Sequence, residues 1–187
     1  MNRLAFTRCY LCGAMDRVPD AGVEWRRRLR QDHNDLKIVW LDPTAKPIDI
    51  GVEDAESRAR RHQAKACGQY DVVVKEINPI RRVDLRMVDI SDWLVVNIDL
   101  EVHACGTLEE VFLANRQKKP ILVHVEQGKC NAPDWLFATI PHQLIFDNWL
   151  QVGDYIQHIA HDPVIETLNR WMFFNFHGEN LEDYSCQ

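Results

Sequence analysis

The chain has 187 residues, of which 46% are hydrophobic and 27% charged, a balance typical of one globular domain with its own core. The formal net charge of −6 argues against a protein whose whole surface binds polymeric nucleic acid. Neither a signal peptide nor an apolar run of about 18 residues is found in the sequence, so we expect a cytoplasmic protein that does not enter a membrane.

The first half of the chain alternates β-rich and helix-prone segments. The run LAFTRCYL is rich in strand-forming residues and is soon followed by Gly13, and KIVWLDP closes at Pro43, so both predict strands. The segment from Ala21 to Gln31 sets Val23, Trp25 and Leu29 among arginines, and the segment from Val52 to Cys67 is polar and helix-prone. We expect strands over 4–11 and 37–43, and helices over 21–31, 52–67 and 79–90.

The second half continues this alternation. The run DWLVVNIDL is apolar enough for a buried strand, and so is ILVHVE, which follows Pro120. Between them the apolar residues Leu108, Val111 and Phe112 recur at helical spacing, with Asn115 on the same side. We expect strands over 92–100, 121–126 and 142–147, and helices over 107–118 and over the aromatic-rich segment 148–174.

Strands that alternate with helices predict a parallel sheet. The fold class expected is therefore α/β, a single Rossmann-like (flavodoxin-like) domain over 1–187. Its sheet should have about five strands with helices on both faces, and its C-terminal part, about 148–187, should be helical. In such sheets ligands bind beyond the carboxyl ends of the strands. One of these ends spans Asn97 to Glu110, which places Glu110 at the rim of the expected pocket.

Metal and redox chemistry find little support in the sequence. Cys9 and Cys12 form a C-x-x-C pair, but residues three apart on a strand point to opposite faces and no second pair follows. The histidines, among them His103, His124 and His142, have no ligand spacing. There is also no Walker loop and no G-x-G-x-x-G. We therefore expect no metal, no cofactor and reduced thiols.

Glu110 has two interpretations. The run Thr107-Leu-Glu-Glu110 matches the capping box S/T-x-x-E, in which both side chains bind the backbone at the start of their own helix. Alternatively, Glu110 is a reactive carboxylate at a helix N-terminus that suits an anionic ligand. Two further carboxylates, Asp84 and Asp92, precede the strand that leads to Glu110.

Three motifs, in order, resemble those of one enzyme family. The run YLCGAM from Tyr10 to Met15, the pair Asp84 and Asp92, and the block from Gly106 to Pro120 are similar to segments of nucleoside 2-deoxyribosyltransferases and related nucleoside and nucleotide N-glycosidases. The run GTLEEVFLANRQKKPILV most resembles a branch common in bacteriophage genomes, so the expected location is then the host cytoplasm.

The resemblance implies that Glu110 is the nucleophile of N-glycosidic bond cleavage or transfer. It also implies an acid that protonates the leaving base, for which Asp84 and Asp92 are the candidates. The expected partner is a small nucleoside or nucleotide, in a homo-oligomer that is a dimer or larger. The residues expected to contact this substrate are Tyr10, Gly13, Met15, His103, Gly106 and Thr107.

One position departs from the family pattern. Members often carry an Asp two residues before the Gly-Thr pair, where this chain has Ala104. This keeps open a catalytically silent protein that binds or sequesters a nucleotide. The base, the 5′-phosphate and the choice between hydrolysis and transfer stay open as well, with Arg17, Arg81, Arg82 and Arg86 as candidate phosphate ligands.

Overall fold

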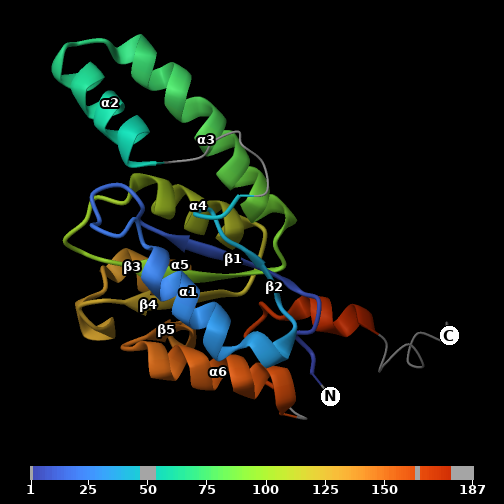
Figure 1. The fold of residues 1–187 in the computed structure, drawn as a ribbon. Coiled ribbons are helices and arrows are strands. Elements are labelled where there is room, and N and C mark those ends of the chain that lie inside the picture. The colour runs from blue at the N-terminus through green and yellow to red at the C-terminus, as the bar shows by residue number, and fades with distance from the viewer. Residues whose placement is uncertain (1, 47–53, 163–164, 178–187) are drawn as a thin grey trace, which may run out of the picture.

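The computed structural model describes residues 2–46, 54–162 and 165–177. Their centre is a five-stranded, fully parallel sheet in the order β2-β1-β3-β4-β5 (Figure 1). The strands are β1 (Arg8–Gly13), β2 (Val39–Leu41), β3 (Trp93–Ile98), β4 (Ile121–Val125) and β5 (Ile145–Phe146). The predicted α/β fold with a parallel sheet of about five strands is confirmed.

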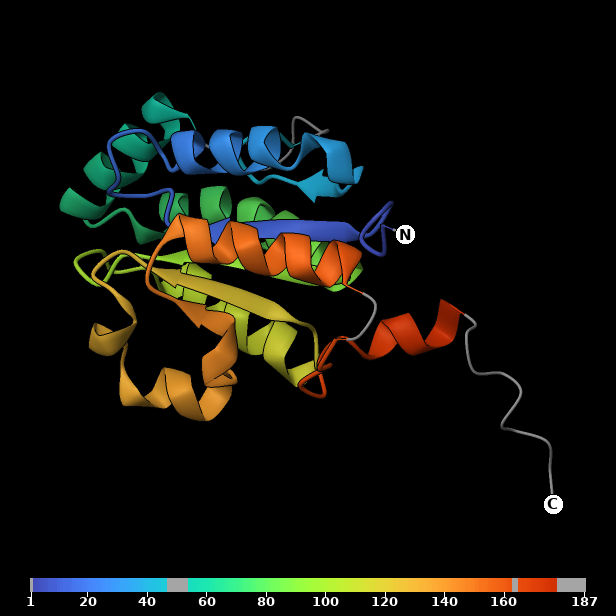
Figure 2. The ribbon, with the colours of Figure 1, turned by 90° about the horizontal axis from the view of Figure 1, so that it is seen from below.

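Helices cover both faces of this sheet (Figures 1 and 2). They are α1 (Val23–Asp32), α2 (Ala55–Ala66), α3 (Tyr70–Ile90), α4 (Cys105–Arg116), α5 (Asp134–Thr139) and α6 (Trp149–His161). Short 3-10 turns span Asn34–Leu36, Lys129–Asn131, His142–Leu144 and Met172–His177. The order of strands reverses between β1 and β3, and this is the point at which open parallel sheets form their ligand crevice.

The central strands are buried on both faces. All of β4 and most of β3 is buried, and Val95, Val96, Leu122 and Val123 are fully inaccessible. Continuous runs of branched apolar residues suit this environment, because both faces of a parallel strand pack against helices. The two faces of β1 separate the helices around it. The Cys12 side chain points toward α4, whereas a side chain at Gly13 would point toward Trp25 of α1.

Two predicted boundaries need correction at the N-terminal side of the fold. The first strand begins at Arg8 and not at residue 4, because Phe6 has a left-handed backbone (φ 64°) that breaks an extended chain. Helix α3 begins at Tyr70 and not at residue 79, so Pro79 lies inside the helix. The β-branched run from Val72 to Val74 concealed its first turns, since such residues have lower helix propensity.

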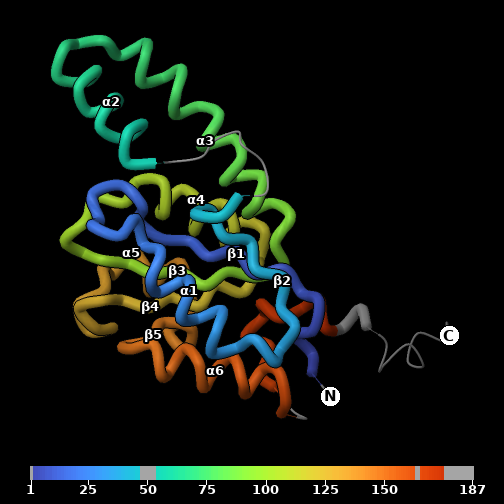
Figure 3. Tube along the Cα trace, viewed as in Figure 1, coloured from blue at the N-terminus to red at the C-terminus, as the bar shows by residue number. Residues whose placement is uncertain are grey.

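Helices α2 and α3 form a pair that extends away from the body of the molecule (Figures 1 and 3). The buried residues of α3 are Ile80, Asp84, Met87 and Val88, all in its second half, while Tyr70 is 66% exposed. The second half of α3 is therefore the part that packs on the body and carries Asp84 there.

The predicted C-terminal helix over 148–174 is also too long. Helix α6 ends at His161, and Trp171 lies beyond it, directly after a turn. Trp171 is fully buried, stacks on Phe174 with ring centres 5.5 Å apart, and contacts Trp93 of β3. These rings pack into the core of the same chain. Residues 178–187 of the predicted C-terminal part lie outside the described residues.

Within the described segments, no helix is both long enough and apolar enough to cross a membrane.

Candidate active site around Glu110

Glu110 is a buried carboxylate on the sheet-facing side of α4. Its Oε1 accepts a hydrogen bond from the Tyr10 hydroxyl at 2.9 Å, and its Oε2 accepts one from the Cys12 thiol at 2.9 Å. Tyr10 and Cys12 lie two residues apart on β1, so both point to the face that α4 covers. The strand thus presents a pair of donors to the two oxygens of one carboxylate.

The capping-box interpretation of Thr107 and Glu110 is wrong. Helix α4 begins at Cys105 with Ala104 as its N-cap residue, and no side chain caps it. Thr107 is therefore already inside the helix, where it is buried with Glu110, Val111 and Ala114. This buried stripe also differs from the predicted one, because Leu108 and Phe112 are 43% and 38% exposed.

Asp84 reaches the same region from α3. It is buried and forms an ion pair with Lys46, whose Nζ lies 2.7 Å from its Oδ1. The Asp84 charge contributes to the electrostatics of Glu110. The structure therefore brings together three residues that the sequence singled out, Tyr10, Asp84 and Glu110, and adds Cys12 and Lys46 to them.

The environment raises the pKa of Glu110 from its ordinary 4.5 to about 7. Burial is the largest cause, because it removes the carboxylate from water, and the Asp84 charge acts in the same direction. Hydrogen bonds from Cys12 and Tyr10, and the charge of Arg26, oppose this rise. A carboxyl group with such a pKa is partly ionised at neutral pH, so it can attack as a carboxylate or hold a proton.

Arg26 is a functional neighbour that the sequence reasoning missed. Helix α1 is rich in arginine, a residue type that is mostly exposed, yet Arg26 is fully buried. Its guanidinium group donates to the carbonyls of Leu11, Gly13 and Gly22 at 3.1, 2.9 and 2.8 Å. It thereby holds the carboxyl end of β1 in place. A signal existed in the sequence, because Arg26 lies three residues before the buried Leu29 and so shares its helix face.

The other predicted contact residues are spread over both faces of the sheet. A side chain at Gly13 would lie 3.1 Å from Trp25 and 3.2 Å from the Asn97 carbonyl, so this glycine serves close packing on the α1 face. Met15 is buried in the loop that follows. Gly106 has open space beside it, and His103 is exposed in the loop before α4. These last two flank the start of the helix that carries Glu110.

Asp92 does not belong to this group. Its carboxylate accepts hydrogen bonds from the Arg8 backbone amide at 2.7 Å and from the Arg8 side chain at 3.0 Å. Asp92 immediately precedes β3, whereas Glu110 follows that strand, so the two lie at opposite ends of it. The sequence already placed Asp92 before this strand and Glu110 after it, and only the structure shows that Asp92 binds Arg8.

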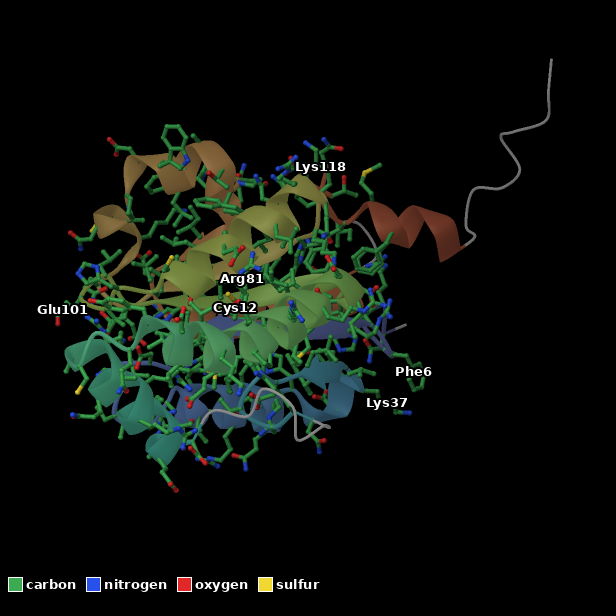
Figure 4. All side chains as sticks on the ribbon, turned by 90° about the horizontal axis from the view of Figure 1, so that it is seen from above. Phe6, Cys12, Lys37, Arg81, Glu101 and Lys118 are labelled. Atoms are coloured by element: carbon green, nitrogen blue, oxygen red, sulfur yellow. The ribbon has the colours of Figure 1, made fainter. Side chains whose placement is uncertain are left out.

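Arg81, a candidate phosphate ligand, forms an ion pair within the protein. Its guanidinium group pairs with the carboxylate of Glu109, with Nε 2.9 Å from Oε2. Figure 4, which looks onto the α3 and α4 face, marks both Arg81 and Cys12. Glu109 and Glu110 are thus neighbours in sequence with different surroundings, one in an exposed ion pair and the other buried against β1.

A separate cavity of about 710 Å³ lies on the other face of the sheet, between α1 and α6. The stacked rings of Trp25 and Trp149, 5.1 Å apart, form part of its wall, and the buried His33 lines it. Glu110 is not among its lining residues, so this cavity is distinct from the carboxylate site. Among the residues that the structure describes, no three His, Cys, Asp or Glu side chains gather as a metal site.

No protein-family model and no curated protein matches the sequence. Solved structures do match the fold. One is a 2-deoxyribosyltransferase from the psychrotolerant bacterium Bacillus psychrosaccharolyticus, described as a biocatalyst for nucleoside synthesis. It is 15% identical, with a TM-score of 0.53 over 85% of this chain and 100% of that one. This chain has a fold similar to that of a 2-deoxyribosyltransferase. A conserved protein from Enterococcus faecalis V583 is 17% identical over 83% of this chain and 98% of its own, with a TM-score of 0.46.

Proposed function

We propose that this protein cleaves or transfers the N-glycosidic bond of a nucleoside, a deoxynucleoside or a 5′-monophosphate of either, with Glu110 as the nucleophile. The observation that carries the proposal is the buried Glu110 carboxylate, oriented by Tyr10 and Cys12 at the point where the strand order reverses. The fold shared with a 2-deoxyribosyltransferase and the three ordered motifs support the same chemistry.

The proposed reaction has two steps. A Glu110 oxygen attacks the anomeric carbon of the sugar, the bond from this carbon to the base nitrogen breaks, and the base leaves with the electron pair and takes up a proton. The transition state has oxocarbenium character, as in retaining glycoside hydrolysis. The glycosyl ester on Glu110 is then opened by water or by the nitrogen of a second base, which restores the carboxylate.

The leaving base needs a proton, and Asp84 is the acidic residue placed to supply it. Asp84 is the candidate aspartate beside Glu110, and it pairs with Lys46 at 2.7 Å. We assign the protonation of the leaving base to Asp84, with Lys46 as its ion-pair partner.

A second candidate function is a catalytically silent protein that binds or sequesters a nucleotide, in favour of which stands Ala104 at the position where the similar family often has Asp. Under either proposal we place the protein in nucleotide metabolism of a phage-type system, in the cytoplasm and as a homo-oligomer.

The experiment is chromatographic detection of free base. The protein is incubated with ribo- and deoxyribonucleosides and their 5′-monophosphates, with and without a second base. We compare the wild type with Glu110→Gln and with Glu109→Gln, a matched control because Glu109 is the exposed neighbour paired with Arg81.

Base release that is lost in Glu110→Gln and kept in Glu109→Gln supports the nucleophile. Release that depends on the second base indicates transfer, whereas release without it indicates hydrolysis. If the wild type releases no base from any substrate but binds a nucleotide tightly, the catalytic proposal is overturned in favour of the binding protein.

A further inference from the structure

We propose that Cys12 is a positioning residue for Glu110, whose thiol hydrogen bond, together with that of Tyr10, fixes the carboxylate in the orientation and charge state needed for attack. For its catalytic consequence, this inference rests on the proposed function. The contact itself belongs to the fold and can be tested without a substrate.

The geometry assigns one donor to each oxygen of Glu110. Cys12 Sγ lies 2.9 Å from Oε2, and the Tyr10 hydroxyl lies 2.9 Å from Oε1. The next acceptor near the thiol is the Thr107 carbonyl, at 3.7 Å, so Glu110 is the main acceptor of the Cys12 hydrogen bond. With both oxygens held, rotation of the carboxylate would break both bonds, which is the physical basis of its fixed orientation.

The thiol acts here as a donor, because it stays protonated. Burial, and then the nearby charge of Glu110, raises the pKa of Cys12 well above its ordinary value. Cys9 is buried on the other face of β1, where its thiol lies 3.8 Å from the Tyr10 carbonyl. Successive residues of a strand face opposite ways, so Cys9 and Cys12, three residues apart, are not arranged as a redox pair.

Other groups around Glu110 act on its pKa beside the Cys12 hydrogen bond, Asp84 against it and Tyr10 and Arg26 in the same direction. On α3, Asp84 adds a negative charge, partly balanced by its partner Lys46. On α1, Arg26 adds a positive charge, and on β1 Tyr10 adds the second hydrogen bond. Since a hydrogen bond to a carboxylate favours its charged form, removal of the Cys12 donor raises the pKa of Glu110 further and leaves less nucleophile at neutral pH.

The catalytic test is the pH profile of kcat/KM for base release in Cys12→Ala and Cys12→Ser. Cys9→Ala serves as the control, because it removes a buried thiol from the same strand on the opposite face. In Cys12→Ala we expect the acid limb to move to higher pH, with a loss of about 10-fold at pH 6 for each unit of displacement, and recovery at alkaline pH. Cys12→Ser keeps a donor and should restore most of the wild-type profile.

A Cys12→Ala profile that is lower at every pH but unchanged in shape would indicate a structural role only, and would overturn the inference. So would a displacement of the same size in Cys9→Ala. If the alanine variant does not fold, Cys12→Ser decides alone, since a serine profile shifted well away from that of the wild type contradicts the donor role.

A second measurement separates this inference from the proposed function. The pH dependence of the free energy of unfolding is compared for the wild type, Cys12→Ala, Glu110→Gln and the double variant, without any substrate. We expect Cys12→Ala to change the pH-dependent part in the presence of Glu110 and not in its absence. Such coupling in a protein that releases no base would sustain the Cys12–Glu110 contact while the proposed function failed; no coupling would overturn the contact.

Discussion

The Tyr10 hydroxyl donates a hydrogen bond to Glu110 across 100 residues of sequence, and the distance between the two oxygens is 2.9 Å. The contact exists because β1 and β3 are adjacent parallel strands, and α4 folds back over β1 directly after β3. It ties the first strand of the chain to the helix that carries the candidate nucleophile.

The stability of the protein should fall as the pH rises from about 4.5 to about 7 through the ionisation of Glu110. The folded protein, in which the pKa of Glu110 is about 7, retains a proton in that range that the unfolded chain, at the ordinary 4.5, has lost. This loss of stability is absent below about pH 4.5 and complete above about pH 7, where it reaches about 3 kcal/mol. Glu110→Gln should remove this slope in urea unfolding at pH 5 to 8. A variant that is no more stable than the wild type at pH 8 would contradict the raised pKa.

Asp84→Asn and Asp92→Asn should have different effects on base release. Asp84 raises the pKa of Glu110, so its neutralisation should move the acid limb of the pH profile to lower pH. It should also slow the protonation of the leaving base, by about 100-fold or more. Asp92 binds Arg8 at the amino end of β3, so Asp92→Asn should leave kcat/KM within about 2-fold of the wild type. A similar loss in both variants would contradict the placement of Asp92.

Arg26→Met should be strongly destabilising. It leaves the carbonyls of Leu11, Gly13 and Gly22 without their buried donor, and we expect a loss of about 3–5 kcal/mol. Arg28→Met is the control from the same helix, because its side chain is 70% exposed and we expect a change of at most about 0.5 kcal/mol. Equal effects in denaturant titrations would show that Arg26 does not hold the end of β1.

Two glycine substitutions should act in opposite directions. Gly22 has a left-handed backbone (φ 71°), and an added Cβ would lie 2.8 Å from the Ala14 carbonyl, so Gly22→Ala should destabilise by about 1–3 kcal/mol. Gly153 lies inside α6, and its added Cβ would meet His33 at 3.4 Å, an ordinary contact. Gly153→Ala should therefore stabilise by about 0.5–1 kcal/mol. Thermal unfolding of both variants tests the pair, and a destabilised Gly153→Ala would show that His33 cannot accommodate a methyl group.

The sequence by itself determined the order of the elements. Apolar runs such as the one over β3 specify strands that are buried on both faces, and helical segments between them force parallel neighbours. These signals are local, so the carboxyl end of β3 and the approximate place of Glu110 followed from them. The start of α3 was missed because its β-branched first turns favour strands locally, and its helical form depends on the whole segment.

Only the tertiary structure decided what each polar side chain does. Glu110 does not cap its own helix, because α4 starts two residues before Thr107. The Glu110 side chain points toward β1 instead. Arg26 is buried where the carbonyls of Leu11, Gly13 and Gly22 accept its hydrogen bonds. Asp92 binds Arg8 at the amino end of β3. Such contacts join residues that are distant in sequence, and hydrogen-bond partners of this kind are set by strand order and helix rotation. Periodicity specifies which residues are buried, whereas the packing of strands and helices selects their partners.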